Sequence, residues 1–260
     1  DPSFSNSPSS DYFAISVLEI DEERKEGTLV HNYAVAGGDL KDHINYFFYV
    51  LTNFDIDMIC IDNAGYQFLD SCNESENFVN AGINLKFIEF DSTKEGIDYG
   101  KEMRKLKTSY NKSNYKICFK QNFTSDFIRK ANEHLQACID YKHIWFASRT
   151  TANGSAFDRQ NSSLVNVKLT GAETTSDLIE AQDALIHQTK KQCALIEVKS
   201  TAKGNQTFDL PQHLKRSTSA NRARRDNYTA LMLANWALKC YFDVRQKKDD
   251  FSATFLPRMV

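Results

Sequence analysis

The amino-acid sequence predicts an α/β protein in which helices flank a mixed β-sheet. Two strand-like runs near the start are joined by a short charged turn, helical and strand-like segments then alternate, and a long apolar helix closes the pattern. This order is typical of sheets that contain parallel strands. A chain of 260 residues, 41% of them hydrophobic, is large enough to bury a sizeable core as one domain.

The first elements follow from apolar spacing and turn residues. Residues 12–20 and 28–36 read as strands, and the short charged turn between them favours an antiparallel hairpin. After Gly37 and Gly38, Asp39 occupies the position of a helix N-cap. Apolar residues then recur at 40, 44, 47, 51 and 54, which predicts a helix with one buried face.

The rest of the chain alternates between helical and strand-like segments. The apolar run 58–61 indicates a buried parallel strand, and it ends at Asp62. The later segments are a helix around 66–80, a strand at 85–90, a helix around 98–107, a strand at 115–119, a helix at 125–141, a mobile loop at 150–163, a helix at 176–190, a strand at 193–198, a polar basic stretch at 199–221 and a buried helix at 228–242.

Composition excludes several classes of protein. The net charge of −2 is not that of a strongly basic nucleic-acid binder, although a local basic patch is compatible with it. The six cysteines lack zinc-ribbon spacing and indicate reduced, buried thiols in a cytoplasmic protein. We expect a soluble chain that is neither secreted nor associated with a membrane, since it shows no signal pattern and no apolar run approaching about 20 residues.

Two carboxylates stand at positions where chemistry is common. An Asp at the end of a core strand, such as Asp62, needs a hydrogen-bond donor, a cation or a metal ion. The carboxyl ends of parallel strands are also where α/β proteins place their active sites. Asp226 precedes the closing helix, where Asp is a frequent N-terminal residue. A helix cap or a loop carboxylate is the simpler interpretation of each.

Basic residues gather around Asp226 in the sequence. They are either a solvated loop or the lining of a groove for a phosphate backbone. The candidate DNA-binding residues are Lys199, Lys203, Lys215, Arg216, Arg222, Arg224 and Arg225.

Three segments together resemble a known family. They are DPSFSNSPSSDYFAISVLEID, MICIDNAGYQFLD and RARRDNYTALMLANWAL, which begin at residues 1, 58 and 222. In this order and spacing they look like the nuclease domain of the large terminase subunit, the DNA-packaging protein of tailed bacteriophages and herpesviruses. The resemblance implies an RNase H-like fold, whose central mixed sheet has three antiparallel strands followed by parallel strands. It also implies a strand leading into Asp1, so that the first strand is truncated here.

The resemblance assigns roles to acidic residues. Asp1, Asp62 and Asp226 would be the catalytic metal ligands, with Asp1 bridging two ions and Asp11 as an auxiliary ligand. Many members have a second acid where this chain has Asn227. The expected cofactors are two Mg²⁺ or Mn²⁺ ions, since such hard ions prefer carboxylate oxygens.

The implied activity is endonucleolytic cutting of double-stranded viral concatemer DNA during genome packaging. Residues 1–260 would form a single nuclease domain, because no phosphate-binding loop of an ATPase motor is present. The implied setting is the cytoplasm of an infected bacterium, with the portal and the small terminase subunit as partners. Two alternatives stay open: another RNase H-like enzyme of the junction-resolvase or transposase type, and a non-catalytic DNA-binding or assembly domain.

Overall fold

A computed structural model gives the fold, and it describes residues 12–62, 65–89, 115–147, 175–200, 206–215 and 225–253. The strands are β1 (Tyr12–Asp21), β2 (Glu26–Ala36), β3 (Ile59–Asp62), β4 (Asn84–Glu89), β5 (Tyr115–Gln121), β6 (Ile144–Phe146), β7 (Glu197–Ser200) and β8 (Gln206–Asp209). The helices are α1 (Leu40–Asn53), α2 (Tyr66–Glu74), α3 (Glu76–Ala81), α5 (Ser125–Asp140), α6 (Thr175–Leu195), α7 (Gln212–Lys215) and α8 (Asp226–Ala253).

The predicted hairpin is confirmed. β1 pairs antiparallel with β2 from Tyr12 opposite Ala36 to Asp21 opposite Glu26. The turn is closed by Asp21, whose Oδ1 accepts hydrogen bonds from the amides of Glu23 and Arg24. A register shift after Val17 marks a β-bulge, which increases the local twist of the hairpin.

The larger strands form two three-stranded units rather than one ladder. In the first half-sheet, β2 lies between β1 and β6, and its pairing with β6 is parallel. In the second half-sheet, β5 lies between β3 and β4, and both pairings are parallel. The sheet is therefore mixed, as predicted, while β7 and β8 form a separate antiparallel pair.

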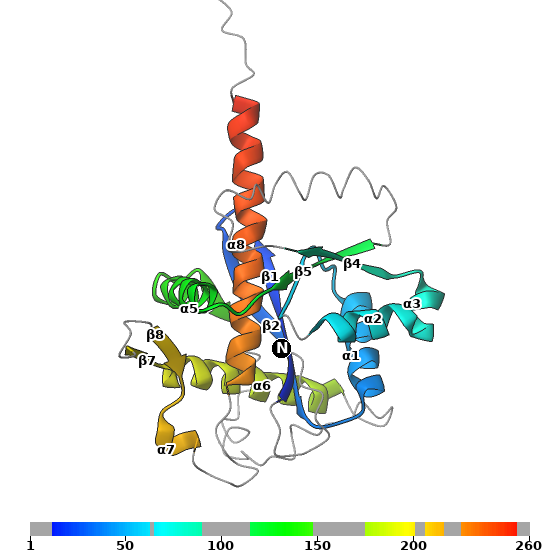
Figure 1. The fold of residues 1–260 in the computed structure, drawn as a ribbon, viewed down its shortest axis with the longest axis horizontal. Helices are drawn as coiled ribbons and strands as arrows, with labels where there is room; N and C mark the ends of the chain where they lie inside the picture. The colour runs from blue at the N-terminus through cyan, green and yellow to red at the C-terminus, as the bar shows by residue number, and fades with distance from the viewer. Residues whose placement is uncertain are drawn as a thin grey trace, which may run out of the picture.

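Helices cover both faces of these half-sheets (Figure 1). Along β1 the side chains alternate in direction: Phe13 packs in a cluster with α1 and α2, and Ala14 packs against α6 and α8. The helices α1, α2 and α3 lie on one side, and α5, α6 and α8 lie on the other (Figure 1). The result is a three-layer α/β/α arrangement.

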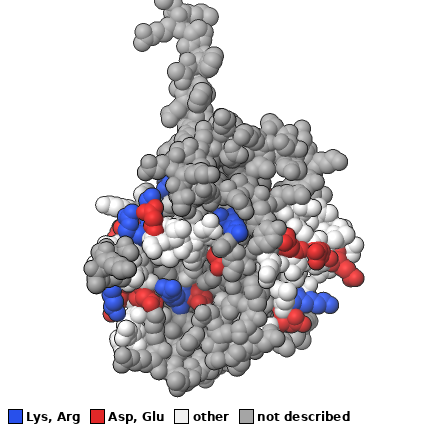
Figure 2. Space-filling model, in the orientation of Figure 1, with Lys and Arg blue, Asp and Glu red and all other residues white. Residues whose placement is uncertain are grey.

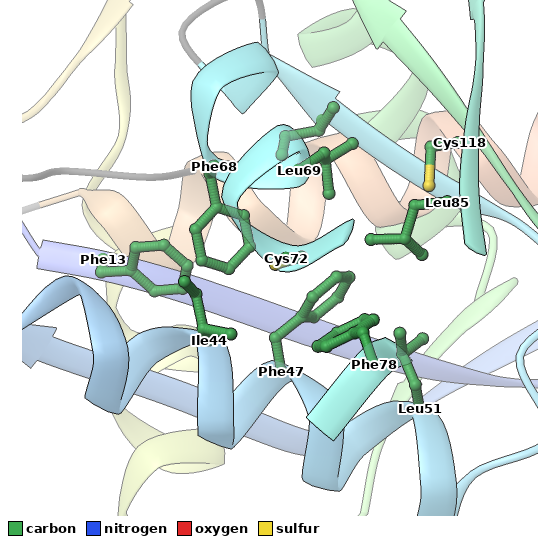
Figure 3. Close-up of a cluster of buried hydrophobic side chains, with 11 residues drawn as sticks. Phe13, Ile44, Phe47, Leu51, Phe68, Leu69, Cys72, Phe78, Leu85 and Cys118 are labelled. Atoms are coloured by element: carbon green, nitrogen blue, oxygen red, sulfur yellow. The ribbon is translucent and has the colours of Figure 1, made fainter. Parts of the chain in front are cut away.

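The layer of α1, α2 and α3 has an aromatic core. Figure 3 shows the side chains of Phe47 and Phe68 pointing toward one another between α1 and α2, with ring centroids 5.5 Å apart. Phe78 from α3 is fully buried beside them. As predicted, α1 begins after Asp39, whose side chain accepts a hydrogen bond from the amide of Lys41.

Some element boundaries differ from the prediction. The expected helix at 66–80 is two helices, because the helical backbone is interrupted at Ser75. The Ser75 hydroxyl donates a hydrogen bond to the Cys72 carbonyl. α3 then ends at Gly82, which has the left-handed φ of 64° that glycine accepts without strain. The closing helix begins at Asp226 and reaches Ala253.

The predicted strand at 193–198 is wrong over its first half. Residues 193–195 continue α6, and only residues 197–200 are extended, as β7. The helix is held by contacts that sequence spacing does not reveal. The side-chain amide of Asn32 on β2 donates a hydrogen bond to the Thr189 hydroxyl, and the backbone amide of Tyr228 on α8 donates one to the Gln192 side chain.

Candidate functional site

Asp226 is a buried carboxylate at the first turn of α8. Its side chain is 6% exposed, and Oδ2 accepts a 2.8 Å hydrogen bond from the amide of Tyr12, the first residue of β1. The amides at a helix start carry partial positive charge, which favours an ionised carboxylate there. The contact also fixes the start of α8 against the first strand.

Other contacts hold the start of α8 in place. The amide of Tyr228 donates to the side chain of Gln192 on α6 at 2.9 Å. The Tyr228 hydroxyl donates to the side-chain oxygen of Asn132 on α5. Hydrogen bonds from α5, α6 and β1 thus fix the first turn of α8. They hold the Asp226 side chain in one orientation, which is what a metal or substrate ligand requires.

Asp62 ends β3, as predicted. Its Oδ1 accepts a 3.0 Å hydrogen bond from the amide of Gly65, which closes the loop between β3 and α2. Gly65 is required by space, since a Cβ there would lie 2.1 Å from Cδ1 of Ile61. The short loop therefore holds the Asp62 carboxylate at the carboxyl end of a parallel strand.

A short series of contacts connects the two carboxylates. Asp226 binds the amide of Tyr12, and the ring of the next residue, Phe13, lies 4.9 Å from the ring of Phe68. Phe68 belongs to the first turn of α2, directly after the loop that begins at Asp62. Both carboxylates are thus anchored where β1 begins and β3 ends, at the same end of the two half-sheets.

Asn227 adds a buried polar group beside Asp226. It is 1% exposed, and within the described part of the chain neither its amide nitrogen nor its amide oxygen has a hydrogen-bond partner. Buried polar groups are nearly always satisfied, by protein, water or a ligand. The sequence singled out Asn227 only because many members of the resembled family have an acidic residue there, and it did not indicate that the side chain is buried.

The other expected acidic ligands, Asp1 and Asp11, lie outside the described residues. Among the described residues, no three His, Cys, Asp or Glu side chains form a group that could hold a metal ion. The expected cluster of three therefore stays a prediction, with Asp62 and Asp226 as its two described members. Their carboxylate oxygens are the donor type that Mg²⁺ and Mn²⁺ prefer.

The candidate DNA-binding residues are described only in part. Lys199 pairs with Glu197 at 2.7 Å, and Arg225 pairs with Asp209 at 3.6 Å and donates to the Phe208 carbonyl. On the face shown in Figure 2, described basic and acidic side chains are interspersed. The side chain of Lys215, at the end of α7, and the residues Lys203, Arg216, Arg222 and Arg224 lie outside the described part.

A buried cluster of histidine and tyrosine was not predicted from the sequence. Nε2 of His31 lies 2.8 Å from the hydroxyl of Tyr46, and Nδ1 of His43 lies 3.1 Å from the hydroxyl of Tyr33. Burial lowers the pKa of His31 to about 4. In the sequence each of these residues fits an ordinary strand or helix pattern. The cluster forms only when α1 packs against β2, which the sequence does not show.

The described cysteines agree with the expectation of reduced, buried thiols. All six cysteines are free. Burial raises the pKa of Cys60, Cys72 and Cys118, which keeps these thiols protonated and unreactive. Among the described helices, none combines the length and the apolar character that crossing a membrane requires.

Comparisons with known proteins add no relative to this picture. No protein-family model matches the chain, and the searches of curated proteins and of solved structures found no significant match.

Proposed function

We propose that this chain is a metal-dependent endonuclease that cuts DNA, with Asp62 and Asp226 as metal ligands. The observation that supports it best is the anchoring of these two carboxylates at one end of the half-sheets, one at the end of a parallel strand and one buried at a helix start. The terminase-like motifs are a further support, because they assign the same two residues together with Asp1.

Each residue has a role that its position favours. Asp226, fixed by Tyr12 and by the packing of α8, would bind one metal ion, and Asp62 would bind a second. An ionised carboxylate accepts up to about four hydrogen bonds or metal contacts, so the backbone bonds that both accept leave this role open. Bound divalent ions would stabilise charge on the phosphodiester oxygens during hydrolysis. The buried amide of Asn227 would then bind a buried water molecule beside Asp226.

The finer proposal follows from the resemblance. Asp1 would bridge the two ions, Asp11 would assist, and the basic residues around Asp226 would hold the backbone of double-stranded DNA. The substrate would be concatemeric viral DNA, and the RNase H-like description of the sheet belongs to the same proposal. Contacts with phosphates fix position rather than sequence, so we expect cleavage with little sequence preference.

The direct test is cleavage of supercoiled plasmid by the purified chain with Mg²⁺, Mn²⁺ or EDTA. We expect either metal ion to support nicking and linearisation, and EDTA to abolish both. Asp226→Asn and Asp62→Asn should each slow cleavage by on the order of 100-fold or more, because the amide no longer supplies a negative oxygen to the metal. Each amide oxygen can still accept the backbone bond, so the fold should survive.

The matched control is Asp140→Asn at the exposed end of α5, which should cleave at the wild-type rate. Circular dichroism and urea unfolding would establish that all three variants fold. Full metal-dependent cleavage by the Asp62 and Asp226 variants would overturn the assignment. A preference for branched substrates, or strand transfer, would favour the resolvase or transposase alternative over the terminase type.

A second candidate, a non-catalytic DNA-binding or assembly domain, is favoured by one observation. Both carboxylates accept backbone hydrogen bonds that stabilise the fold by themselves, Asp62 in a loop and Asp226 between α8 and β1. Titration calorimetry with Mn²⁺ distinguishes the two. The nuclease proposal predicts binding that Asp226→Asn weakens, and the structural role predicts no metal binding at either site.

A further inference from the structure

One face of the first half-sheet changes character at the β-bulge. Before the bulge α1 covers this face, where Phe54, the C-cap residue of α1, lies over His31 with ring centroids 5.1 Å apart. His31 is opposite Val17, the last residue of β1 before the register shift. Glu19 follows Val17 by two residues, so its side chain points to the same face, but it is exposed. The helix layer on this face therefore ends before the sheet does.

The strand register brings several exposed side chains together here. Glu19 of β1 is opposite Thr28 of β2, and Thr28 is opposite Trp145 of β6. In the next row, Asp21 is opposite Glu26. Directly opposed residues share one face of a sheet. These five residues form two adjacent rows, and we refer to them as the open face.

A solvated sheet face is ordinary, but two features of the open face are not. Asp21 and Glu26 place like charges directly opposite one another, an arrangement that lowers stability. Trp145 is 45% exposed on a strand of only three residues, although an indole usually buries most of its area. Its N–H donates to Glu26 at 2.7 Å, which holds the ring in one orientation. An oriented, exposed tryptophan is typical of a surface that binds another molecule.

The surroundings of the open face are acidic. Glu19 lines a cavity together with Asp55 and Asp57, which follow α1 in the chain. Arg24 pairs with Asp21 at 3.9 Å, but both side chains are exposed, so the pair contributes little. The cations of the adjoining turns, at positions 24, 25 and 142, are fewer than the carboxylates at 19, 21–23, 26, 55 and 57. Such a surface repels a phosphate backbone and attracts arginine and lysine side chains.

The open face lies at the opposite end of the first half-sheet from Asp226. Asp226 contacts Tyr12 at the start of β1, whereas the hydroxyl of Tyr241, later in α8, donates to Glu22 in the hairpin turn. The helical segment between residues 226 and 241 spans about 22 Å at 1.5 Å per residue. A molecule bound to the open face is therefore remote from Asp226.

We propose that the open face binds a basic peptide segment of a protein partner. An arginine of this segment packs on the exposed ring of Trp145, and its guanidinium group pairs with the carboxylate of Glu26. Further cationic side chains pair with Glu19 and Asp21, which removes the repulsion between the opposed carboxylates. The inference rests on the open face alone and does not depend on the proposed nuclease function.

The test measures binding of a fluorescein-labelled peptide of four arginine–alanine pairs to the 260-residue chain. We expect saturable binding that weakens by about 10-fold or more between about 50 and 300 mM NaCl, because the contacts are between exposed charges. A lysine–alanine peptide should bind more weakly, since a guanidinium group stacks on an indole better than an ammonium group does. A matched glutamate–alanine peptide should not bind.

Substitutions on the open face separate binding from stability. Combining Glu19→Gln with Glu26→Gln should weaken binding of the arginine peptide by about 10-fold, because two charge pairs are lost. The melting temperature should stay the same or rise, since the variant removes like-charge repulsion and the new amide oxygen still accepts the Trp145 N–H. A double variant that melts well below the unchanged chain would overturn the proposal, because these carboxylates would then serve to stabilise the fold.

The aromatic contact has its own variant and controls. Trp145→Leu should weaken binding by roughly 3-fold or more, because the cation–π contact is lost. The unlabelled peptide should change the tryptophan fluorescence of the unchanged chain and not that of this variant. The matched controls are Glu76→Gln, in the first turn of α3, and Phe123→Leu, an exposed aromatic after β5. Both should bind the arginine peptide as the unchanged chain does.

Three further outcomes would overturn the proposal. The first is unchanged binding of the arginine peptide by the double variant or by Trp145→Leu. The second is weaker binding of duplex DNA by these same variants, which would make the open face a nucleic-acid surface. The third is a dimer in sedimentation experiments that Trp145→Leu dissociates, because a second copy of the chain would then cover the face.

Discussion

The two half-sheets are held to their helices by different kinds of contact. In the first, β2 buries His31 and Asn32, and each polar side chain is hydrogen-bonded to a neighbouring helix. In the second, most buried side chains are apolar or thiols, such as Ile61, Cys118 and Phe119, and the buried amide of Gln121 donates to the carbonyl of the next residue, Asn122. Hydrogen bonds are directional, so individual bonds determine which helices pack on the first half-sheet. Packing of helices on the second half-sheet depends mainly on the volume and shape of apolar side chains.

The comparison indicates how each unit should respond to a substitution. Apolar packing is not directional and tolerates an unfilled space at a moderate cost, while a buried polar network loses whole hydrogen bonds when displaced. Changes on the two sides should differ in kind, and the predictions below use that difference, from the largest expected effect to the smallest.

Removing a buried ring from the aromatic core between α1 and α3 should have the largest effect. Phe78→Ala should destabilise the protein by about 3–5 kcal/mol, because the ring is fully buried against Phe47 and Phe48 and leaves a cavity. Urea unfolding at pH 7 would measure it. Val79→Ala, on the next residue of α3 but 62% exposed, is the matched control and should change stability by less than about 0.5 kcal/mol. Equal effects of the two would contradict the assigned packing.

Removing the buried side-chain amide of Asn32 from the first half-sheet should lower the free energy of unfolding by nearly as much. Asn32 accepts from the Ser16 hydroxyl at 2.7 Å and donates to Thr189 at 2.6 Å, which ties β1, β2 and α6 together. Asn32→Ala should destabilise the fold by roughly 2–3 kcal/mol, since these buried groups lose a partner. Asn53→Ala, at the exposed end of α1, should have little effect in the same unfolding experiment. A tolerated Asn32→Ala would remove the distinction between the half-sheets.

The sequence predicts local elements well where one face is buried. The spacing behind α1 and the alternation along β1 and β2 identify these elements because each has a single apolar face. β6 has only three residues and was missed, since its pairing with β2 depends on contacts distant in the chain. Residues 193–195 look strand-like alone, but packing of α6 against β2 and α8 keeps them helical.

The site was predictable only one carboxylate at a time. Asp62 was found because an apolar strand ends there, and Asp226 because a buried helix begins there. Sequence spacing cannot show that Tyr12 binds Asp226, or that Asn227 is buried without a partner, because each depends on how α8 packs.

Acid should weaken the first half-sheet selectively, because the buried histidines on and beside β2, His31 and His43, favour the neutral form. Burial lowers the pKa of His31 from its ordinary 6.5 to about 4 in the folded protein. Between these values the unfolded chain binds the proton and the folded chain does not, so stability is complete above about pH 6.5 and falls as the pH drops toward 4. The expected loss at pH 5 is about 2 kcal/mol relative to pH 7.

Urea unfolding and hydrogen exchange at pH 7 and pH 5 would measure this effect. His31→Gln should reduce the pH dependence and leave a remainder from His43 and His134, because burial lowers the pKa of these histidines too. His143→Gln, at an exposed position, should leave the pH dependence unchanged. Amides of β1 and β2 should lose more protection than those of β4 and β5, because no histidine occurs in β3, β4 or β5. Uniform loss across both half-sheets would mean that they unfold as one cooperative unit and that the contrast between their contacts has no thermodynamic consequence.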